Sequence, residues 1–181
     1  ADWSQAYVDS LKIGRLGFRG IEIMCKRPHV PASDFGEAEW PRLKSCIEAR
    51  NLKVINLNCS TLFAVGNCAP PAQDVLPEED LEDRIAHTKQ SLRLASYLGC
   101  RNISIPTGAP PQNLKRGEFK ALFHQRLERV LPLAEELDLD VLVEPEPGLL
   151  GDNLGHFKAF LEEVGFRRAI LARELTLEEI A

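Results

Sequence analysis

Hydrophobic residues recur along this chain in two alternating patterns. One has the three-to-four-residue spacing of an amphipathic helix, and the other is the short apolar run of a buried strand. The predicted helix and strand pairs are 3–11 with 20–25, 40–52 with 53–59, 81–98 with 102–105, and 119–137 with 140–144. Strands that alternate with helices indicate βαβ units, because parallel neighbours need a crossover connection. The sequence therefore predicts an α/β fold with a parallel sheet.

The last predicted helix of the series and the end of the chain depart from this pattern. Pro132 lies inside the fourth helical segment, where it should kink or break the helix. Helical spacing resumes over residues 154–165, and we expect no strand directly after Gly165. Two alternatives stay open for residues 169–180: one helix, or a helix leading to a short strand at 174–177.

Composition and charge limit the classes of function. The 181 residues, 44% of them hydrophobic, are enough for one core, and we expect a single domain over residues 1–181. The net charge of -5 argues against a nucleic-acid partner. The sequence has no apolar run of about 18 residues and no signal-peptide pattern, which predicts no membrane partner and a cytoplasmic location.

The five cysteines include no CxxC pair. That pattern fits neither a disulfide framework nor a zinc ribbon. We expect most of these cysteines to be buried as small apolar residues.

Polar side chains accumulate where the predicted strands end. In parallel α/β folds, ligands bind at the carboxyl ends of the strands. The polar residues at those ends are Glu22, Cys25, Lys26, His29, Asn56, Asn58, Ser104, Thr107, Glu144 and Glu146.

Glu144 is the strongest candidate among them. Period-two alternation places Leu142, Glu144 and Glu146 on one face of the strand and Val143 on the other. Burial of an unpaired carboxylate is costly, so Glu144 needs a metal, a cation or hydrogen-bond donors. This pattern favours a metal-binding or active-site role over a structural salt bridge.

The other candidates each carry two interpretations. Asn56 and Asn58 share a face and could bind sugar hydroxyls, or they could satisfy loop backbone. His29 is an acid/base or substrate-contact candidate, or a solvated loop residue. Glu146 is held between two prolines, either to support a ligand or as an exposed loop residue.

The remaining histidines and the common motifs add no competing site. His87, His124 and His156 fall in helical patterns, and we assign them to structure or solvent. The sequence has no GxGxxG, GxxxxGK[ST], GxSxG or HExxH motif, so dinucleotide, P-loop, α/β-hydrolase and zincin functions lose their usual support.

Several segments resemble one known family. Residues 17–23 and 58–67 resemble the second and third barrel strands of the xylose-isomerase-like sugar isomerases and epimerases, and residues 87–95 resemble their third helix. Residues 133–148 are similar to a fifth strand whose terminal Glu binds a divalent metal. The resemblance implies a (β/α)8 TIM barrel, with Glu144 as metal ligand and catalytic residue.

The chain also departs from that family. Such enzymes complete the metal site with an Asp, a His and a second Glu from strands six to eight, which this sequence does not show. Glu174 and Thr176 stand where a seventh strand would carry histidines. A full barrel needs roughly 250 residues. We therefore expect an incomplete barrel with strands 2–5 of the family pattern, truncated or interrupted after about residue 165.

The resemblance implies a sugar (phosphate) isomerase or epimerase that transfers a proton next to a carbonyl. The expected cofactor is Mn²⁺ or Mg²⁺, with Zn²⁺ or Co²⁺ as alternatives. The expected substrate-binding residues are Glu22, His29, Asn56, Asn58 and Glu146.

Two other functions remain open. One is a phosphodiester-cleaving relative of the apurinic-endonuclease branch, which shares the barrel and uses several metals. The other is a non-catalytic half barrel whose open sheet edge is covered by a homodimer partner.

Overall fold

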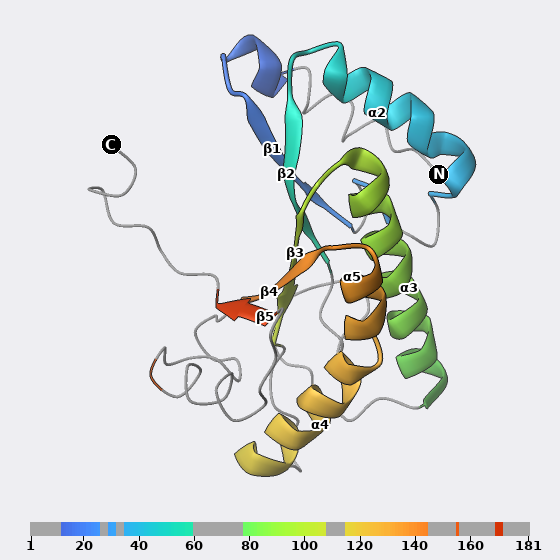
Figure 1. Ribbon diagram of the computed structural model, residues 1–181, viewed down its shortest axis with the longest axis vertical. Helices are drawn as coiled ribbons and strands as arrows, with labels where there is room; N and C mark the ends of the chain where they lie inside the picture. Colours follow the sequence, from blue (N-terminus) through green and yellow to red (C-terminus); the bar gives the residue numbers. More distant parts are fainter. Residues whose placement is uncertain are drawn as a thin grey trace.

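The computed structural model describes residues 12–25, 29–31, 35–59, 78–107, 115–144, 155 and 169–171. Its strands are β1 (Gly20–Met24), β2 (Lys53–Asn58), β3 (Asn102–Pro106), β4 (Asp140–Glu144) and β5 (Ala169–Leu171). Its helices are η1 (Glu37–Glu39), α2 (Trp40–Glu48), α3 (Glu78–Leu98), α4 (Arg116–Glu128) and α5 (Leu131–Glu136). Figure 1 shows their arrangement.

The five strands form one parallel sheet in the order β1-β2-β3-β4-β5. Sheet order equals chain order, as expected when each strand is joined to the next by a crossover on the same side. In Figure 1 the helices α2, α3 and α5 lie on one side of the sheet. The predicted α/β class and parallel sheet are confirmed.

The end of the sheet corrects one prediction. We expected no strand directly after Gly165 and a helix from residue 169 onward, but β5 pairs with β4 through Val141↔Ala169, Leu142↔Ile170 and Val143↔Leu171. A three-residue apolar run is too short to show a period, so its pairing with β4 defines it as a strand. The predicted segments 3–11 and 174–177 lie outside the described residues, as does 154–165 except for the helical Gly155.

Pro132 separates two helices, as predicted. It stands at the start of α5, where its missing N–H is tolerated, and α4 ends four residues earlier at Glu128.

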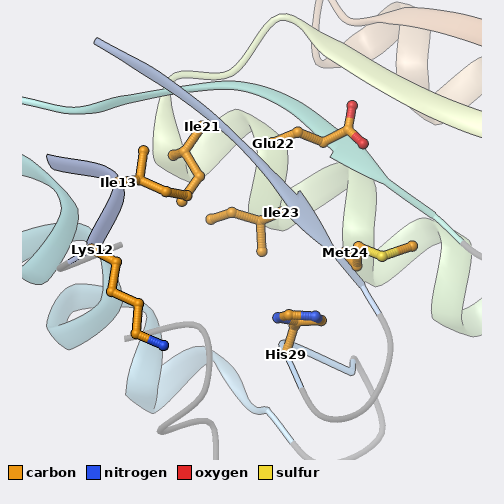
Figure 2. Close-up of a pocket in the computed structure, with 7 residues that line it drawn as sticks. All are labelled: Lys12, Ile13, Ile21, Glu22, Ile23, Met24 and His29. Atoms are coloured by element: carbon orange, nitrogen blue, oxygen red, sulfur yellow. The ribbon is translucent and has the colours of Figure 1, made fainter. Parts of the chain in front are cut away.

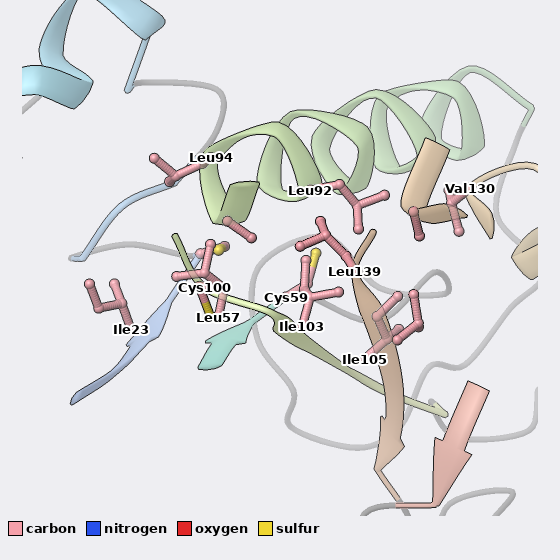
Figure 3. Close-up of a cluster of buried hydrophobic side chains, with 14 of the residues drawn as sticks. Ile23, Leu57, Cys59, Leu92, Leu94, Cys100, Ile103, Ile105, Val130 and Leu139 are labelled. Carbon is pink, nitrogen blue, oxygen red and sulfur yellow. The ribbon is translucent and has the colours of Figure 1, made fainter. Parts of the chain in front are cut away.

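The core lies between the sheet and the helices. In β1 and β4 alternate residues are buried toward the helices, and in β3 and β4 Ile103, Ile105, Val141 and Val143 are fully buried. Leu92 of α3, Cys59 and Ile103 belong to one buried cluster, which Figure 3 shows between α3 and the strands. Burial of such an aliphatic side chain contributes about 1.5–3 kcal/mol.

The cysteines behave largely as predicted. Cys25, Cys59 and Cys100 are buried, and Cys46 is partly exposed. Burial raises the pKa of Cys25 and Cys100, so both remain un-ionised at neutral pH. Cys68 lies outside the described residues.

Among the helices of the described residues, none is long and apolar enough to span a membrane.

Candidate active site

Four neighbouring strands bring polar side chains to the face of the sheet that is turned away from the helices. These residues are Glu22 of β1, Asn56 and Asn58 of β2, Ser104 of β3 and Glu144 of β4, and hydrogen bonds connect them. We call this group the polar cluster. The cluster unites four of the predicted site residues, which lie up to 122 positions apart in sequence.

Asn56 is the best-connected member of the polar cluster. Its Nδ2 donates to Glu22 Oε2 at 2.6 Å and to Ser104 Oγ at 2.9 Å. Because a carboxylate accepts hydrogen bonds, the nitrogen of the amide must face Glu22. The carbonyl Oδ1 of Asn56 is buried and has no hydrogen-bond partner among the described residues.

Asn58 lies between the two carboxylates. Its Nδ2 is 3.5 Å from Glu22 Oε1 and 3.4 Å from Glu144 Oε2. Both distances are at the long end for hydrogen bonds, so each contact is weak. A single amide group therefore links a carboxylate from β1 with one from β4, across two intervening strands.

Glu144 has the orientation that alternation predicted. Val141 and Val143 are buried toward the helices, while Leu142 and Glu144 are only partly buried on the other face. The prediction that this carboxylate finds hydrogen-bond donors is met in part by Asn58. Its metal-binding role stays a prediction.

The chemistry of the polar cluster suits a hard cation. It offers two carboxylates and the amide oxygen of Asn56, and Mg²⁺ and Mn²⁺ prefer such oxygen ligands. Within the described ranges, no group of three or more His, Cys, Asp or Glu side chains could hold a metal ion. The donors therefore fit such a metal in kind, and further ligands would have to come from water, substrate or other parts of the protein.

The structure does not bring His29 into the polar cluster. A cavity of about 310 Å³ next to β1 is lined by Lys12, Ile13, Ile21, Glu22, Ile23, Met24 and His29. In Figure 2, His29 lies with Ile23 on one side of β1, whereas the Glu22 carboxylate points to the other side. The sequence could not show on which side of β1 the following segment, which carries His29, would lie.

The other predicted strand-end residues have varied positions. Glu146 and Lys26 lie outside the described residues. Cys25 and Thr107 are fully buried, and Cys25 continues the helix-facing alternation of Ile21 and Ile23.

Ser104 is a member of the polar cluster for which the sequence indicated no role. It pairs with Asn58 in the sheet register and accepts a hydrogen bond from Asn56. The signal in the sequence was a small polar residue between two isoleucines. In the structure Ser104 is 4% exposed.

His87 lies away from the polar cluster, as predicted. It is on α3 and shares a hydrogen bond with the backbone of Cys25. Burial lowers the pKa of His87, so the imidazole is neutral at pH 7. Within the part of the chain that the structure describes, its buried Nε2 has no hydrogen-bond partner.

Comparison with known proteins supports the arrangement of the fold. Residues 12–171 match the family described as xylose isomerase-like TIM barrel. No curated protein matches the sequence.

Solved structures with this fold are similar over most of the chain. A xylose isomerase-like TIM barrel protein from Mycobacterium smegmatis, in complex with magnesium, has a TM-score of 0.74 and 12% identity, covering 97% of this chain and 57% of that one. The 3-keto-D-glucoside 4-epimerase YcjR from E. coli has a TM-score of 0.69 and 13% identity, covering 92% and 62%. D-psicose 3-epimerase from Clostridium cellulolyticum H10, solved with D-tagatose, has a TM-score of 0.66 and 14% identity, covering 99% and 63%.

The chain thus spans about three fifths of the length of these structures. At such low identity the likeness establishes the fold.

Proposed function

The chain belongs to the xylose isomerase-like TIM barrel family, and we propose that it is part of a divalent-metal-dependent isomerase or epimerase that acts on a sugar or sugar phosphate. The observation that carries this proposal is the pair of carboxylates, Glu22 and Glu144, that converge on the amide of Asn58. Two of the similar structures are sugar epimerases by name, which supports the same class of reaction.

Glu144 would hold the metal, which we expect to be Mg²⁺ or Mn²⁺. The similar Mycobacterium smegmatis protein was solved with magnesium. When bound, the metal would polarise the sugar carbonyl and so make the neighbouring C–H more acidic.

The amides and Glu22 would orient the sugar. A carboxylate accepts hydrogen bonds from hydroxyl groups, and Glu22 is the more exposed of the two carboxylates in the polar cluster. Because the Asn58 contacts are long, a hydroxyl group of the sugar could replace them at little cost. The sugar would then lie between the two carboxylates, within reach of Glu144.

Proton transfer would follow from this placement. A carboxylate beside the activated carbon accepts the proton next to the carbonyl and returns it, and such general acid–base catalysis typically contributes about 10²–10⁴-fold. We assign this transfer to Glu144, which is the catalytic residue of the proposal.

The test is exchange of carbon-bound hydrogen with solvent. The protein is loaded with Mn²⁺ or Mg²⁺ and incubated in D₂O with a panel of ketoses that includes D-fructose, and loss of the C–H signal is followed by NMR. We expect exchange and a stoichiometric metal in the wild type, and loss of both in Glu144→Gln. Glu37→Gln, an exposed carboxylate on η1, is the matched control and should change neither. The proposal would be overturned if the wild type retains no metal after loading and catalyses no hydrogen exchange in any sugar of the panel.

A further inference from the structure

The strand β2 contains a bulge directly before the two asparagines of the polar cluster. Ile21 of β1 pairs with Val54, but the next residue, Glu22, pairs with Asn56, so Ile55 is an extra residue. Val54 and Leu57 are both buried toward the helices, although unbroken alternation would place them on opposite faces. The bulge therefore changes the alternation and lets Asn56 and Asn58 face Glu22.

Gly20 leaves the space that the bulge needs. A Cβ atom at Gly20 would lie 2.9 Å from Cγ2 of Ile55 and 3.2 Å from its Cδ1. The Cγ2 atom sits on a β-branched carbon, so it moves only when χ1 rotates or the backbone shifts. The Ile55 side chain, 55% exposed, thus fills the place of the missing Gly20 side chain.

Asn102 contacts the bulge from β3, the neighbour of β2 on the side opposite to β1. Its Nδ2 donates to the backbone carbonyl of Ile55 at 3.2 Å. The register pairs between β2 and β3 are Leu57↔Ile103 and Asn58↔Ser104, both beyond Ile55. A side-chain amide therefore supplies the hydrogen bond to the carbonyl of the bulged residue.

We propose that Gly20 and Asn102 are positioning residues of the polar cluster: together they fix the bulge at Ile55, and the bulge places the Asn56 amide that holds the Glu22 carboxylate. Neither residue belongs to the polar cluster itself. Without the bulge, a shift of one residue would turn Asn56 toward the helices. The catalytic part of this inference rests on the proposed function, whereas the positioning part does not.

The first experiment follows the Asn56 side-chain amide by ¹H–¹⁵N NMR in Gly20→Ala. We expect its resonance to move, because its hydrogen bond to Glu22 is disturbed, and the added mutation Ile55→Ala should restore it by removing the clashing atoms. Gly36→Ala is the matched control, since that glycine has a φ of -78° and an added Cβ would lie within 4 Å of no other described residue. An unchanged Asn56 resonance in Gly20→Ala, or no recovery in the double variant, would overturn the role of Gly20.

The second experiment tests Asn102 independently with Asn102→Asp. This side chain has nearly the same shape but cannot donate to the Ile55 carbonyl, so the Asn56 resonance should move here as well. A resonance that stays in place would overturn the role of Asn102.

The exchange assay then separates positioning from the proposed function. We expect kcat for sugar exchange to fall about tenfold in Gly20→Ala and Asn102→Asp, with a thermal midpoint close to that of Gly36→Ala, and to recover in Gly20→Ala with Ile55→Ala. Wild-type protein that shows the expected resonances but no exchange would contradict the proposed function alone. Exchange that is unaffected while the Asn56 resonance moves would overturn the catalytic part of this inference.

Discussion

The two faces of the sheet differ in burial and in polarity, although the same strands form both. On the helix-facing side, Ile23 and Val143 are at most 4% exposed and the alternation is filled with apolar side chains. On the other side lie their direct neighbours in sequence: Glu22 contacts the amides of Asn56 and Asn58, and Glu144 contacts that of Asn58. The comparison shows that one face supplies stability and the other presents chemistry, so the consequences of substitution should separate by face.

The largest expected difference is in stability, between two residues of β2. Leu57 is fully buried against the helices, and Leu57→Ala should lower the free energy of unfolding by about 2–5 kcal/mol. Ile55→Ala, on the other face and 55% exposed, should cost at most about 1 kcal/mol. Urea unfolding of both variants measures this, and equal losses would contradict the division between the faces.

A smaller effect is expected from an added charge in the polar cluster. Asn58→Asp would place a third carboxylate next to Glu22 and Glu144, and like-charge repulsion should destabilise the protein by about 1 kcal/mol at low ionic strength. Added Mn²⁺ should then raise the melting temperature more than in the wild type, because a cation relieves the repulsion.

Asn51→Asp is the control for that measurement. Asn51 is exposed, and its positive φ of 55° is tolerated by both Asn and Asp. A similar Mn²⁺ response in the two variants would show that Mn²⁺ acts through general surface charge.

The pH dependence of stability should come from the helix-facing side. Burial lowers the pKa of His87 below its usual 6.5, so below that pH the unfolded chain binds a proton that the folded protein does not. The contribution of His87 is therefore constant above pH 6.5 and is lost as pH falls below it. The free energy of unfolding, measured with urea at pH values on both sides of 6.5, should depend less on pH in His87→Gln than in the wild type. An identical pH dependence in the two proteins would exclude His87 as the source.

The smallest effect is expected at the amino ends of the strands. Arg101 Nε contacts Asp140 Oδ2 at 3.0 Å, but the arginine side chain is 61% exposed. Arg101→Met should cost about 0.5 kcal/mol or less, and high salt should remove the difference. A larger, salt-independent loss in thermal unfolding would mean that the arginine stem contributes packing.

The sequence alone determined the strands β1 to β4, the helices between them and the facing of the side chains in β4. Apolar periodicity indicated strands and helices, and alternation placed Val143 toward the helices and Glu144 on the other face, because both patterns are local properties of the chain. It also singled out Glu22, Asn56, Asn58 and Glu144 through the rule that polar groups gather at the carboxyl ends of parallel strands.

Only the tertiary structure decided which of these groups meet. His29 lies on the other side of β1 from the Glu22 carboxylate, Ser104 joins the polar cluster, and β5 exists through its pairing with β4. The bulge that aims Asn56 depends on a glycine from β1 and an amide from β3. These outcomes depend on contacts between residues far apart in sequence, and no local period of hydrophobic and polar positions carries that information.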